Sequence, residues 1–259
     1  MKPIRIDLSE DIKEIEIIPI ADIHLGDTSC DFKRVMETIK YIEEHDNVYA
    51  ILNGDLMDCA IKSSIGDSYG AALQPMEQLH QCVKIFEPIR DKILCVLPGN
   101  HEERIYKTDG VDMTRLMCDQ LKIFDRYSNT TALLFVRFGR DCGRTHHKRK
   151  ILYTIYCNRG SGGGRKEGGK VNRVADLASV VDADIYIGSH THLPFVMKEA
   201  FFRIDTANSS VAKVDKLFVN TSAALEYGGY GDRAAFKPAS LDNPVIWLSG
   251  TVKKMRATL

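Results

Sequence analysis

Four short segments of the sequence carry histidine, aspartate and asparagine side chains at spacings that suit a metal ion. These segments are Asp22-Ile23-His24, Gly54-Asp55, Asn100-His101 and His190-Thr191-His192. Residues two apart in an extended strand point the same way, so the first and last segments would each offer two ligands to one ion. Mixed oxygen and nitrogen ligands suit Mn, Fe, Zn or Ni. Each segment alone is weak evidence, because such short combinations often arise by chance.

Each of the four segments follows a short apolar run that predicts a buried strand. These runs cover residues 14–20, 48–52, 92–97 and 184–188. Apolar residues at helical spacing over 32–44 and 75–89 predict helices between the first three strands. Alternating strands and helices indicate a parallel sheet covered by helices, and such sheets place their sites beyond the carboxyl ends of the strands. The shared position of the candidate ligands is therefore stronger evidence than any one motif.

Two further stretches carry charges or glycines that bear on function. Residues 139–150, between predicted strands over 131–138 and 151–157, are strongly basic and form either a solvated hairpin tip or a lip that attracts phosphates. The glycine-rich residues 158–166 follow a strand and precede a predicted helix over 171–180. Such backbone beside cations can cradle a phosphate, which makes Gly162, Gly163 and Arg165 candidate substrate-binding residues; the alternative is a flexible linker.

The remaining segments complete one domain over residues 1–259. A short helix is expected over 112–121, a loop over 63–70, and strands over 195–204, 213–220 and 245–250 that complete an antiparallel or mixed second sheet. Asp58 lies close behind Asp55 and is either a ligand, a residue that supports a ligand, or a helix cap. No linker or internal repeat divides the chain.

Composition limits the classes of protein to which the chain can belong. Apolar residues make up 44% and charged residues 27% of the 259 residues, which is ordinary for a globular protein. Its net charge of zero gives no global field that would favour nucleic acid or membrane. Seven cysteines without a CxxC pair fit a reducing compartment. We find no apolar signal core or membrane span, and expect a cytoplasmic protein, in the host cytoplasm if a phage encodes it.

The ordered set of motifs resembles the calcineurin-like metallophosphoesterase family, in particular its phage and bacterial members. The resemblance covers roughly residues 15–195 and rests on the four segments above, taken in order together with Glu102 and Ser189. It implies an α/β fold, specifically a four-layer α/β/β/α sandwich of two mixed sheets flanked by helices. It also implies a site for two metal ions between the sheets.

The resemblance assigns a role to each candidate ligand. One divalent metal ion would be held by four residues: Asp22, His24, Asp55 and His192. The other would be held by Asp55, Asn100, His190 and one further histidine, so that Asp55 bridges the two ions. A metal-bound hydroxide would attack phosphorus, while His101 would stabilise or protonate the leaving oxygen. In this mechanism Asn100 also contacts the substrate.

One position departs from the family pattern. Where the family has the further histidine ligand before a glycine, this sequence has Arg159-Gly160. A protonated guanidinium has no lone pair to offer a metal. Three interpretations are open: the second metal binds weakly through three protein ligands and water, Arg159 replaces its charge and clamps the phosphate, or the chain is catalytically impaired and acts as a binding protein.

The resemblance and the charged segments together predict the substrate class. We expect a phosphoesterase whose substrates are phosphodiesters such as nucleotides or nucleic acid ends, because the glycine-rich loop and the basic segment favour several phosphates. Phosphomonoesters, including protein phosphates, are the alternative. A partner membrane is not expected, and the chain would be a monomer or a homodimer.

Overall fold

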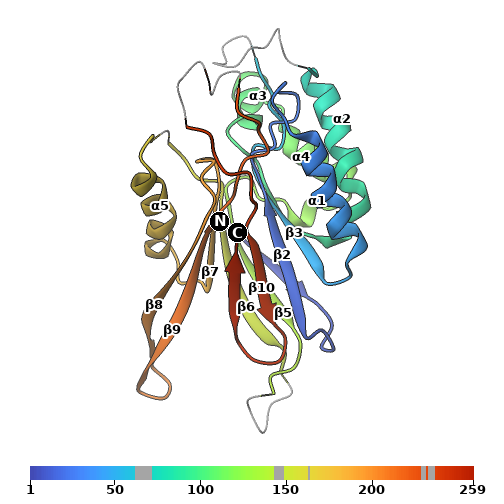
Figure 1. The fold of residues 1–259 in the computed structure, drawn as a ribbon. Helices are drawn as coiled ribbons and strands as arrows, with labels where there is room; N and C mark the ends of the chain where they lie inside the picture. Colours follow the sequence, from blue (N-terminus) through green and yellow to red (C-terminus); the bar gives the residue numbers. More distant parts are fainter. Residues whose placement is uncertain (62–71, 143–148, 163, 229–231, 233–236) are drawn as a thin grey trace.

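The computed structural model describes residues 1–61, 72–142, 149–162, 164–228, 232 and 237–259. The predicted loop over 63–70, Gly163 and most of the basic tip, including His146 and His147, lie outside these described residues. The described part folds around two β-sheets that face each other (Figure 1).

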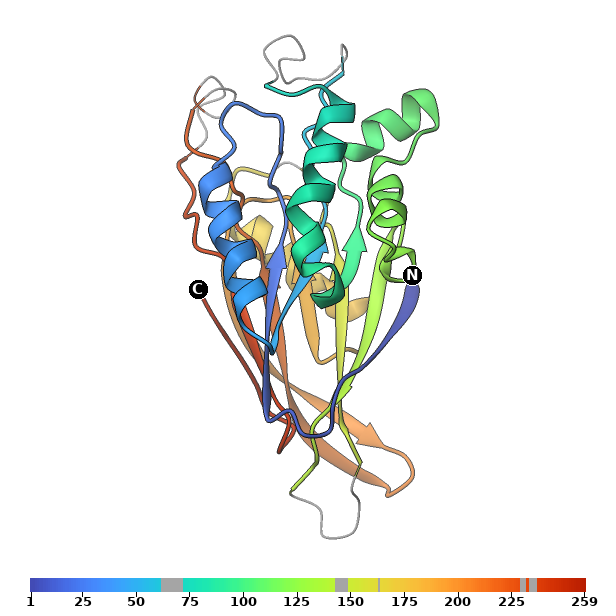
Figure 2. The same ribbon diagram turned by 90° about the vertical axis from the view of Figure 1, so that its right-hand side faces the viewer.

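A five-stranded sheet carries the amino-terminal half of the candidate site. Its order is β11 (Met255–Thr258), β10 (Val245–Ser249), β2 (Glu14–Ile20), β3 (Val48–Asn53) and β4 (Ile93–Leu97). The strands β2, β3 and β4 run parallel, as predicted, whereas β10 runs antiparallel to β2. Helices α1 (Phe32–Glu44), α2 (Pro75–Phe86) and α4 (Met113–Gln120) cover its outer face (Figure 2).

A six-stranded sheet carries the carboxyl-terminal half of the site. Its order is β1 (Lys2–Asp7), β5 (Thr131–Phe138), β6 (Ile151–Asn158), β7 (Ile185–Gly188), β9 (Ser210–Asn220) and β8 (Phe195–Asp205). It contains three parallel pairs and two antiparallel pairs of strands, so this sheet is mixed, as the resemblance implied. Helix α5 (Glu167–Ala175) covers its outer face.

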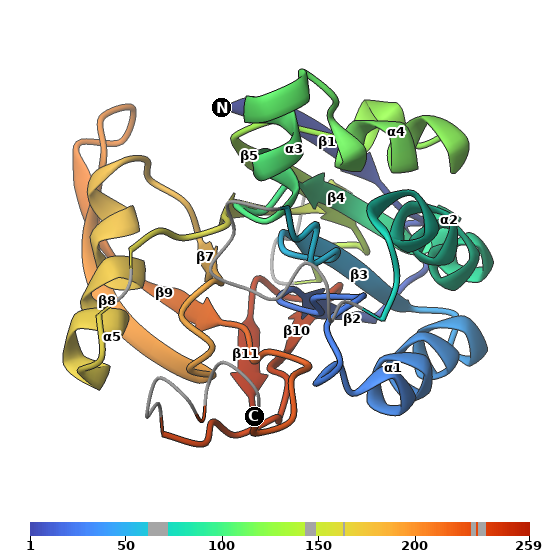
Figure 3. The same cartoon turned by 90° about the horizontal axis from the view of Figure 1, so that it is seen from above.

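Three apolar clusters in the described residues define the layers of the fold. One lies between the helices α1, α2 and α4 and the five-stranded sheet, one lies between the two sheets, and a smaller one lies beneath α5. Alternation along β2 explains how one strand serves two layers: Ile15 and Ile17 face the other sheet, while Ile18 and Ile20 face the helices. The four-layer α/β/β/α sandwich is thereby confirmed (Figure 3).

Several element boundaries differ from those predicted from the sequence. The run over 75–89 splits into α2 and the 3-10 helix η1 (Glu87–Lys92), and the helix expected over 171–180 is α5 followed by the 3-10 helix η3 (Asp176–Ser179). The structure adds β1, β11, the 3-10 helix η2 (Phe124–Arg126) and α3 (Glu102–Asp109), which we did not predict. Within the described residues, no helix has the length and apolar character needed to span a membrane.

Candidate metal centre

The predicted ligands lie in an unusual backbone conformation directly after their strands. Asp22, His24, Asp55, His190 and His192 have φ values between +50° and +71°, the left-handed region that residues with a side chain rarely adopt. The extended geometry that we expected at the Asp-x-His and His-x-His pairs is therefore wrong, since β2 and β7 end before them. In this conformation the side chains of Asp22, His24 and His192 come together, while His190 lies beside Asp55.

Backbone hydrogen bonds between neighbouring loops stabilise this conformation. The amide of Asp22 donates to the carbonyl of Gly54 at 3.0 Å, and the amide of His24 donates to the carbonyl of Asp55 at 3.0 Å. The carbonyl of Asp22 in turn accepts from the amide of Ala224 at 3.0 Å. Three loops that are distant in sequence thus hold one another at the carboxyl ends of the strands.

Asp22, His24 and His192 form the first cluster with the geometry of a metal site. The Nε2 atoms of His24 and His192 lie 3.4 Å apart, and His192 Nε2 lies 3.4 Å from Asp22 Oδ1. Burial lowers the pKa of His24 well below its usual value, so its imidazole is neutral and keeps a lone pair. Asp22 Oδ1 is buried without a hydrogen bond, an arrangement that a cation would satisfy. These donors fit a divalent metal ion.

His24, Asp58 and His101 form a second cluster that shares His24 with the first. Nδ1 of His101 lies 2.9 Å from Asp58 Oδ1, and Nδ1 of His24 lies 3.9 Å from the same oxygen. Burial opposes protonation of His101, but the hydrogen bond to Asp58 raises its pKa above the usual value. Two adjacent His/Asp clusters are consistent with a binuclear metal site. Asp58 contacts the two histidines and caps no helix in the described part of the chain.

The predicted second metal set is only partly assembled by direct contacts. Nδ1 of His190 lies 3.6 Å from Asp55 Oδ2, and Asp55 Oδ1 accepts a 2.8 Å hydrogen bond from the amide of His101. Burial favours the neutral acid, yet the hydrogen bond with His190 holds the pKa of Asp55 below its usual range. Asn100 is half-buried in the turn that leads from β4 into α3.

Arg159, for which the resemblance implies a histidine, pairs with α3. Its Nη1 lies 2.8 Å from Glu103 Oε1, and Glu103 Oε2 also lies 3.2 Å from the Nζ of Lys107. The guanidinium therefore has a carboxylate partner in the protein itself. A guanidinium has no lone pair to offer a metal, so Arg159 itself cannot act as the further ligand that the resemblance implies.

Arg104 and Glu102 contact the candidate site, although the sequence analysis gave Glu102 no role and did not consider Arg104. The Nη2 of Arg104 lies 2.9 Å from His101 Nε2, one turn away on α3. Glu102 is buried and accepts hydrogen bonds from the amides of Leu56, Met57 and Gly99 at 2.7–2.9 Å. Burial raises the pKa of Glu102 to about 7, against the effect of these bonds. The available sequence evidence was that both residues lie close to the candidate ligand Asn100. Helix α3 turns their side chains toward the site.

Helix α5 connects the glycine-rich loop to the histidine loop. Arg173 donates to the carbonyls of Ser161 and Gly162 at 2.8 and 2.5 Å, and the Nζ of Lys170 donates to the carbonyl of Thr191 at 2.8 Å. Gly162 has φ +81°, and a Cβ there would lie 2.9 Å from the Arg173 guanidinium. The candidate substrate-binding residue Arg165 is exposed just before α5.

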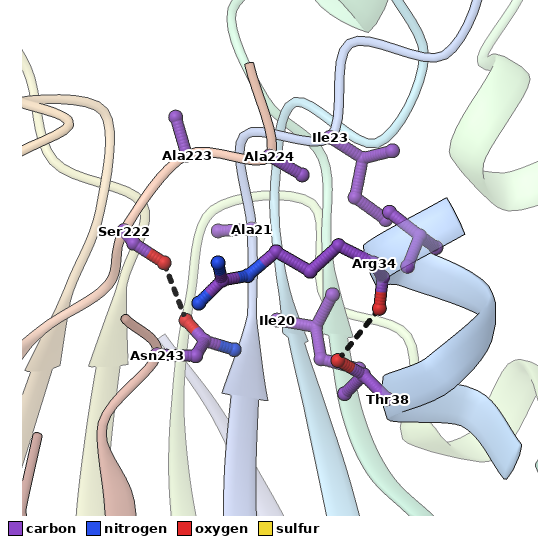
Figure 4. A pocket seen from close by; sticks show the side chains of 10 residues that line it. Ile20, Ala21, Ile23, Arg34, Thr38, Ser222, Ala223, Ala224 and Asn243 are labelled. Atoms are coloured by element: carbon purple, nitrogen blue, oxygen red, sulfur yellow. Dashed lines mark hydrogen bonds between the residues drawn. The ribbon is translucent and has the colours of Figure 1, made fainter. Parts of the chain in front are cut away.

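A small pocket of about 30 Å³ lies beside Ala21, directly before the candidate ligand Asp22 (Figure 4). Arg34 of α1 points into it, and Ser222 donates a 3.0 Å hydrogen bond to Asn243 at its wall. Its volume suits a water molecule rather than a substrate. The pocket therefore adds no substrate site.

Comparison with known proteins identifies the family. No curated protein matches the chain. A predicted phosphoesterase from Streptococcus pneumoniae TIGR4 is 14% identical, with a TM-score of 0.35 over 95% of this chain and 99% of that chain. The nuclease MPE from Pseudomonas putida is 12% identical, with a TM-score of 0.37 over 93% of this chain and 87% of that chain. Zn²⁺-bound Vps29 from Entamoeba histolytica is 11% identical, with a TM-score of 0.38 over 94% of this chain and 97% of that chain. The calcineurin-like phosphoesterase family matches residues 16–194, which is more than half of the sequence. The chain therefore belongs to the calcineurin-like phosphoesterase family.

Proposed function

We propose that the protein is a metal-dependent phosphodiesterase. The observation that carries this proposal is the buried, unpartnered Asp22 Oδ1 beside the imidazoles of His24 and His192. A buried oxygen of this kind costs free energy unless a cation binds it, and the neighbouring imidazoles are nitrogen ligands. Membership of the family, whose substrates are phosphate esters, supports the same conclusion.

Two sets of residues would hold the metals. Asp22, His24, His192 and Asp55 would hold the first ion, whereas the second would rely on Asp55, Asn100 and His190. A bound dication would polarise the phosphoryl oxygens and activate a water molecule. Because Arg159 lacks a lone pair, the second ion would have three protein ligands and would bind more weakly than the first.

His101 would act on the leaving oxygen. Its Nδ1 faces Asp58 Oδ1 at 2.9 Å, which fixes the ring and leaves Nε2 for proton transfer. The Nη2 of Arg104 lies 2.9 Å from this nitrogen and would turn to a phosphate oxygen when substrate binds. Asp58 would be a positioning residue, since it acts through His101.

The cations around the site favour substrates with more than one phosphate. Residues 159–173 contain Arg159, Arg165, Lys166, Lys170 and Arg173 against one acidic residue, whereas the whole chain is neutral. Within this stretch Arg173 and Lys170 donate to loop carbonyls, and the side chains of Arg165 and Lys166 are exposed. Nucleotides and the ends of nucleic acids carry phosphates at suitable spacing beyond the cleaved ester.

A second candidate function is a binding protein without turnover. The specific observation that favours it is the Arg159–Glu103 ion pair, formed by the residue that stands where the resemblance implies a metal-ligand histidine. Such a protein would bind phosphate-bearing ligands through the same loops. Phosphomonoester hydrolysis is a third candidate and would use the same metal centre.

The test compares bis-p-nitrophenyl phosphate with p-nitrophenyl phosphate in the presence of Mn²⁺. We expect the wild-type chain to hydrolyse the diester faster, and Asp22→Asn to lose both activities because it removes a ligand charge. A faster monoester reaction would replace the diesterase proposal with a phosphomonoesterase. Turnover of neither ester, together with retained binding of a nucleotide, would establish the binding protein instead.

A further inference from the structure

The hairpin of β8 and β9 carries the most exposed large apolar side chains of the described residues. Phe202, Ile204 and Val211 are 80%, 72% and 63% exposed. The hairpin projects away from the rest of the molecule at the end opposite α3 (Figure 1). Burying such side chains is favourable, so this surface is a candidate for contact with a protein.

The strand register places the three apolar side chains on one face. Ile204 pairs with Val211, and Phe202 lies two residues before Ile204 on the same side of β8. Leu217 and Val219, which share this side of β9, belong to the core between the two sheets. The three exposed apolar side chains thus lie on the same side of the sheet as the inter-sheet core, and the Lys198–Asp215 ion pair at 3.6 Å lies between them and that core.

Strand β8 is also an edge of its sheet. It ends the strand order, and among the described residues it pairs with β9 alone. The strand is 11 residues long, and in the described part of the chain no second strand pairs with its outer edge. Edges of this kind readily accept a strand from another chain.

We propose that β8 pairs with β8 of a second copy of this chain, antiparallel and centred on Phe201. The two six-stranded sheets would then form one continuous sheet across a two-fold axis. In an antiparallel pair with this centre, residues at equal distances from Phe201 on opposite sides face each other.

This register satisfies two independent kinds of complementarity. Glu199 lies opposite Arg203 of the partner subunit, which pairs opposite charges twice across the axis. Ala200 lies opposite Phe202 of the partner subunit, so a small side chain leaves room for a large one on the apolar face. Arg203 contacts Asp182 at 3.1 Å, and this contact holds its guanidinium on the face that Glu199 of the partner subunit reaches.

Neighbouring registers lack these matches. A pair centred on Phe202 would put Glu199 opposite Asp205 of the partner subunit, which places like charges together. A pair centred on Ala200 would put Glu199 opposite Phe201 of the partner subunit and leave its charge without a partner. The charges on β8 therefore select one register, a device that also prevents indiscriminate edge pairing.

Sedimentation equilibrium of the full chain tests the interface. We expect a species of twice 29.1 kDa, whose dissociation constant rises at least tenfold in Glu199→Arg and in Phe202→Asp. The control Glu37→Arg, on the exposed face of α1, should leave the constant unchanged. A chain that stays monomeric at every concentration overturns the proposal, as does a dimer that neither hairpin variant weakens.

Disulfide trapping tests the register. In a Cys142→Ser background, one tagged chain carries Ala200→Cys and a second carries Phe202→Cys; Cys142 is replaced because it is exposed. When the two chains are mixed under oxidising conditions, the disulfide between the two different variants should exceed the disulfides between identical variants. Positions 200 and 202 of opposite subunits would face each other near disulfide distance, whereas two copies of the same position would lie diagonally and farther apart. The proposed register is overturned if the mixed cross-link does not form, or if it forms no more than the cross-links between identical variants.

Discussion

At the scale of single residues, the left-handed ligands show where the fold stores strain. Each such residue costs on the order of 1 kcal/mol or more, and five of them gather around one small space. Their backbone hydrogen bonds, such as that from Asp22 to Gly54, offset part of this cost. Strain concentrated on candidate ligands is consistent with a site that is pre-arranged for metal binding.

Arg159→His should raise the affinity of the second metal site. The substitution removes the Arg159–Glu103 ion pair and supplies an imidazole lone pair where the family has one. Calorimetric titration with Mn²⁺ should then show a second binding event at least tenfold tighter than in the wild-type chain.

Arg159→Gln is the matched control for this experiment. It also breaks the ion pair with Glu103 but supplies no ligand of comparable strength. If Gln and His change the second binding event equally, release of Glu103 rather than a new ligand explains the gain. An unchanged titration in Arg159→His would refute the predicted ligand position.

His101→Gln should slow turnover according to the leaving group. Loss of a general acid costs about 10²–10⁴-fold in rate, and the cost is largest when the leaving oxygen needs a proton. We expect a large loss of kcat on an alkyl or nucleoside diester and a small loss on a p-nitrophenyl diester. Asp58→Asn should show the same pattern more weakly, because it acts only by orienting His101. Equal losses on both leaving groups would contradict a role in proton transfer.

At the scale of elements, the turn between β4 and α3 brings three loops together. Glu102 at the start of α3 accepts amide hydrogen bonds from Leu56 and Met57 after β3, and from Gly99 after β4. A Cβ on Gly99 would lie 2.0 Å from the amide nitrogen of Asp55. The loops after β3 and β4 therefore pack backbone against backbone, which only glycine permits.

Gly99→Ala should destabilise the protein and weaken its metal binding. Overpacking of this kind costs about 1–3 kcal/mol, and here the displaced group is the candidate ligand Asp55. Gly168→Ala is the control, since Gly168 lies in α5 with open space around its Cβ position. It should stabilise by about 0.5–1 kcal/mol, because alanine favours helix. Urea unfolding of both variants measures the difference, and similar values for the two would refute the close approach.

At the scale of the whole molecule, the candidate metal centre joins the two sheets. Asp22 and His24 follow β2 of the five-stranded sheet, whereas His192 follows β7 of the six-stranded sheet. Beneath them the sheets are held together by a continuous apolar core. A metal ion bound by these residues would connect the two sheets at the carboxyl ends of β2 and β7.

Addition of Mn²⁺ to the chelator-treated protein should raise its melting temperature. Ligand at 100 times its dissociation constant stabilises by about 2.7 kcal/mol, and each kcal/mol shifts the midpoint by about 2–4 °C at this size. Differential scanning calorimetry measures the shift. Asp22→Asn should lose most of it, while a shift of equal size in that variant would place the metal elsewhere.

Local pattern predicted the strand ends and a helix-covered parallel sheet well, whereas the four-layer sandwich was predicted from the family resemblance. Apolar runs that end in polar residues mark buried strands, and the alternation of strands and helices limits the architecture. Helix α3 was missed because its sequence, residues 102–109, is strongly charged and has little apolar periodicity. Strand β1 lies at a sheet edge and carries charges on its exposed side, so its pattern was equally weak.

The residue types that could form a metal centre are evident from the sequence, as is Arg159 at the position where the family resemblance implies a further histidine. Side-chain chemistry is local, so its capacity to bind a metal can be judged residue by residue. The three-dimensional structure was needed to show that the ligands meet through left-handed turns instead of extended strands, and that Glu103 pairs with Arg159. These features depend on contacts between loops far apart in the chain, and no local pattern specifies such contacts.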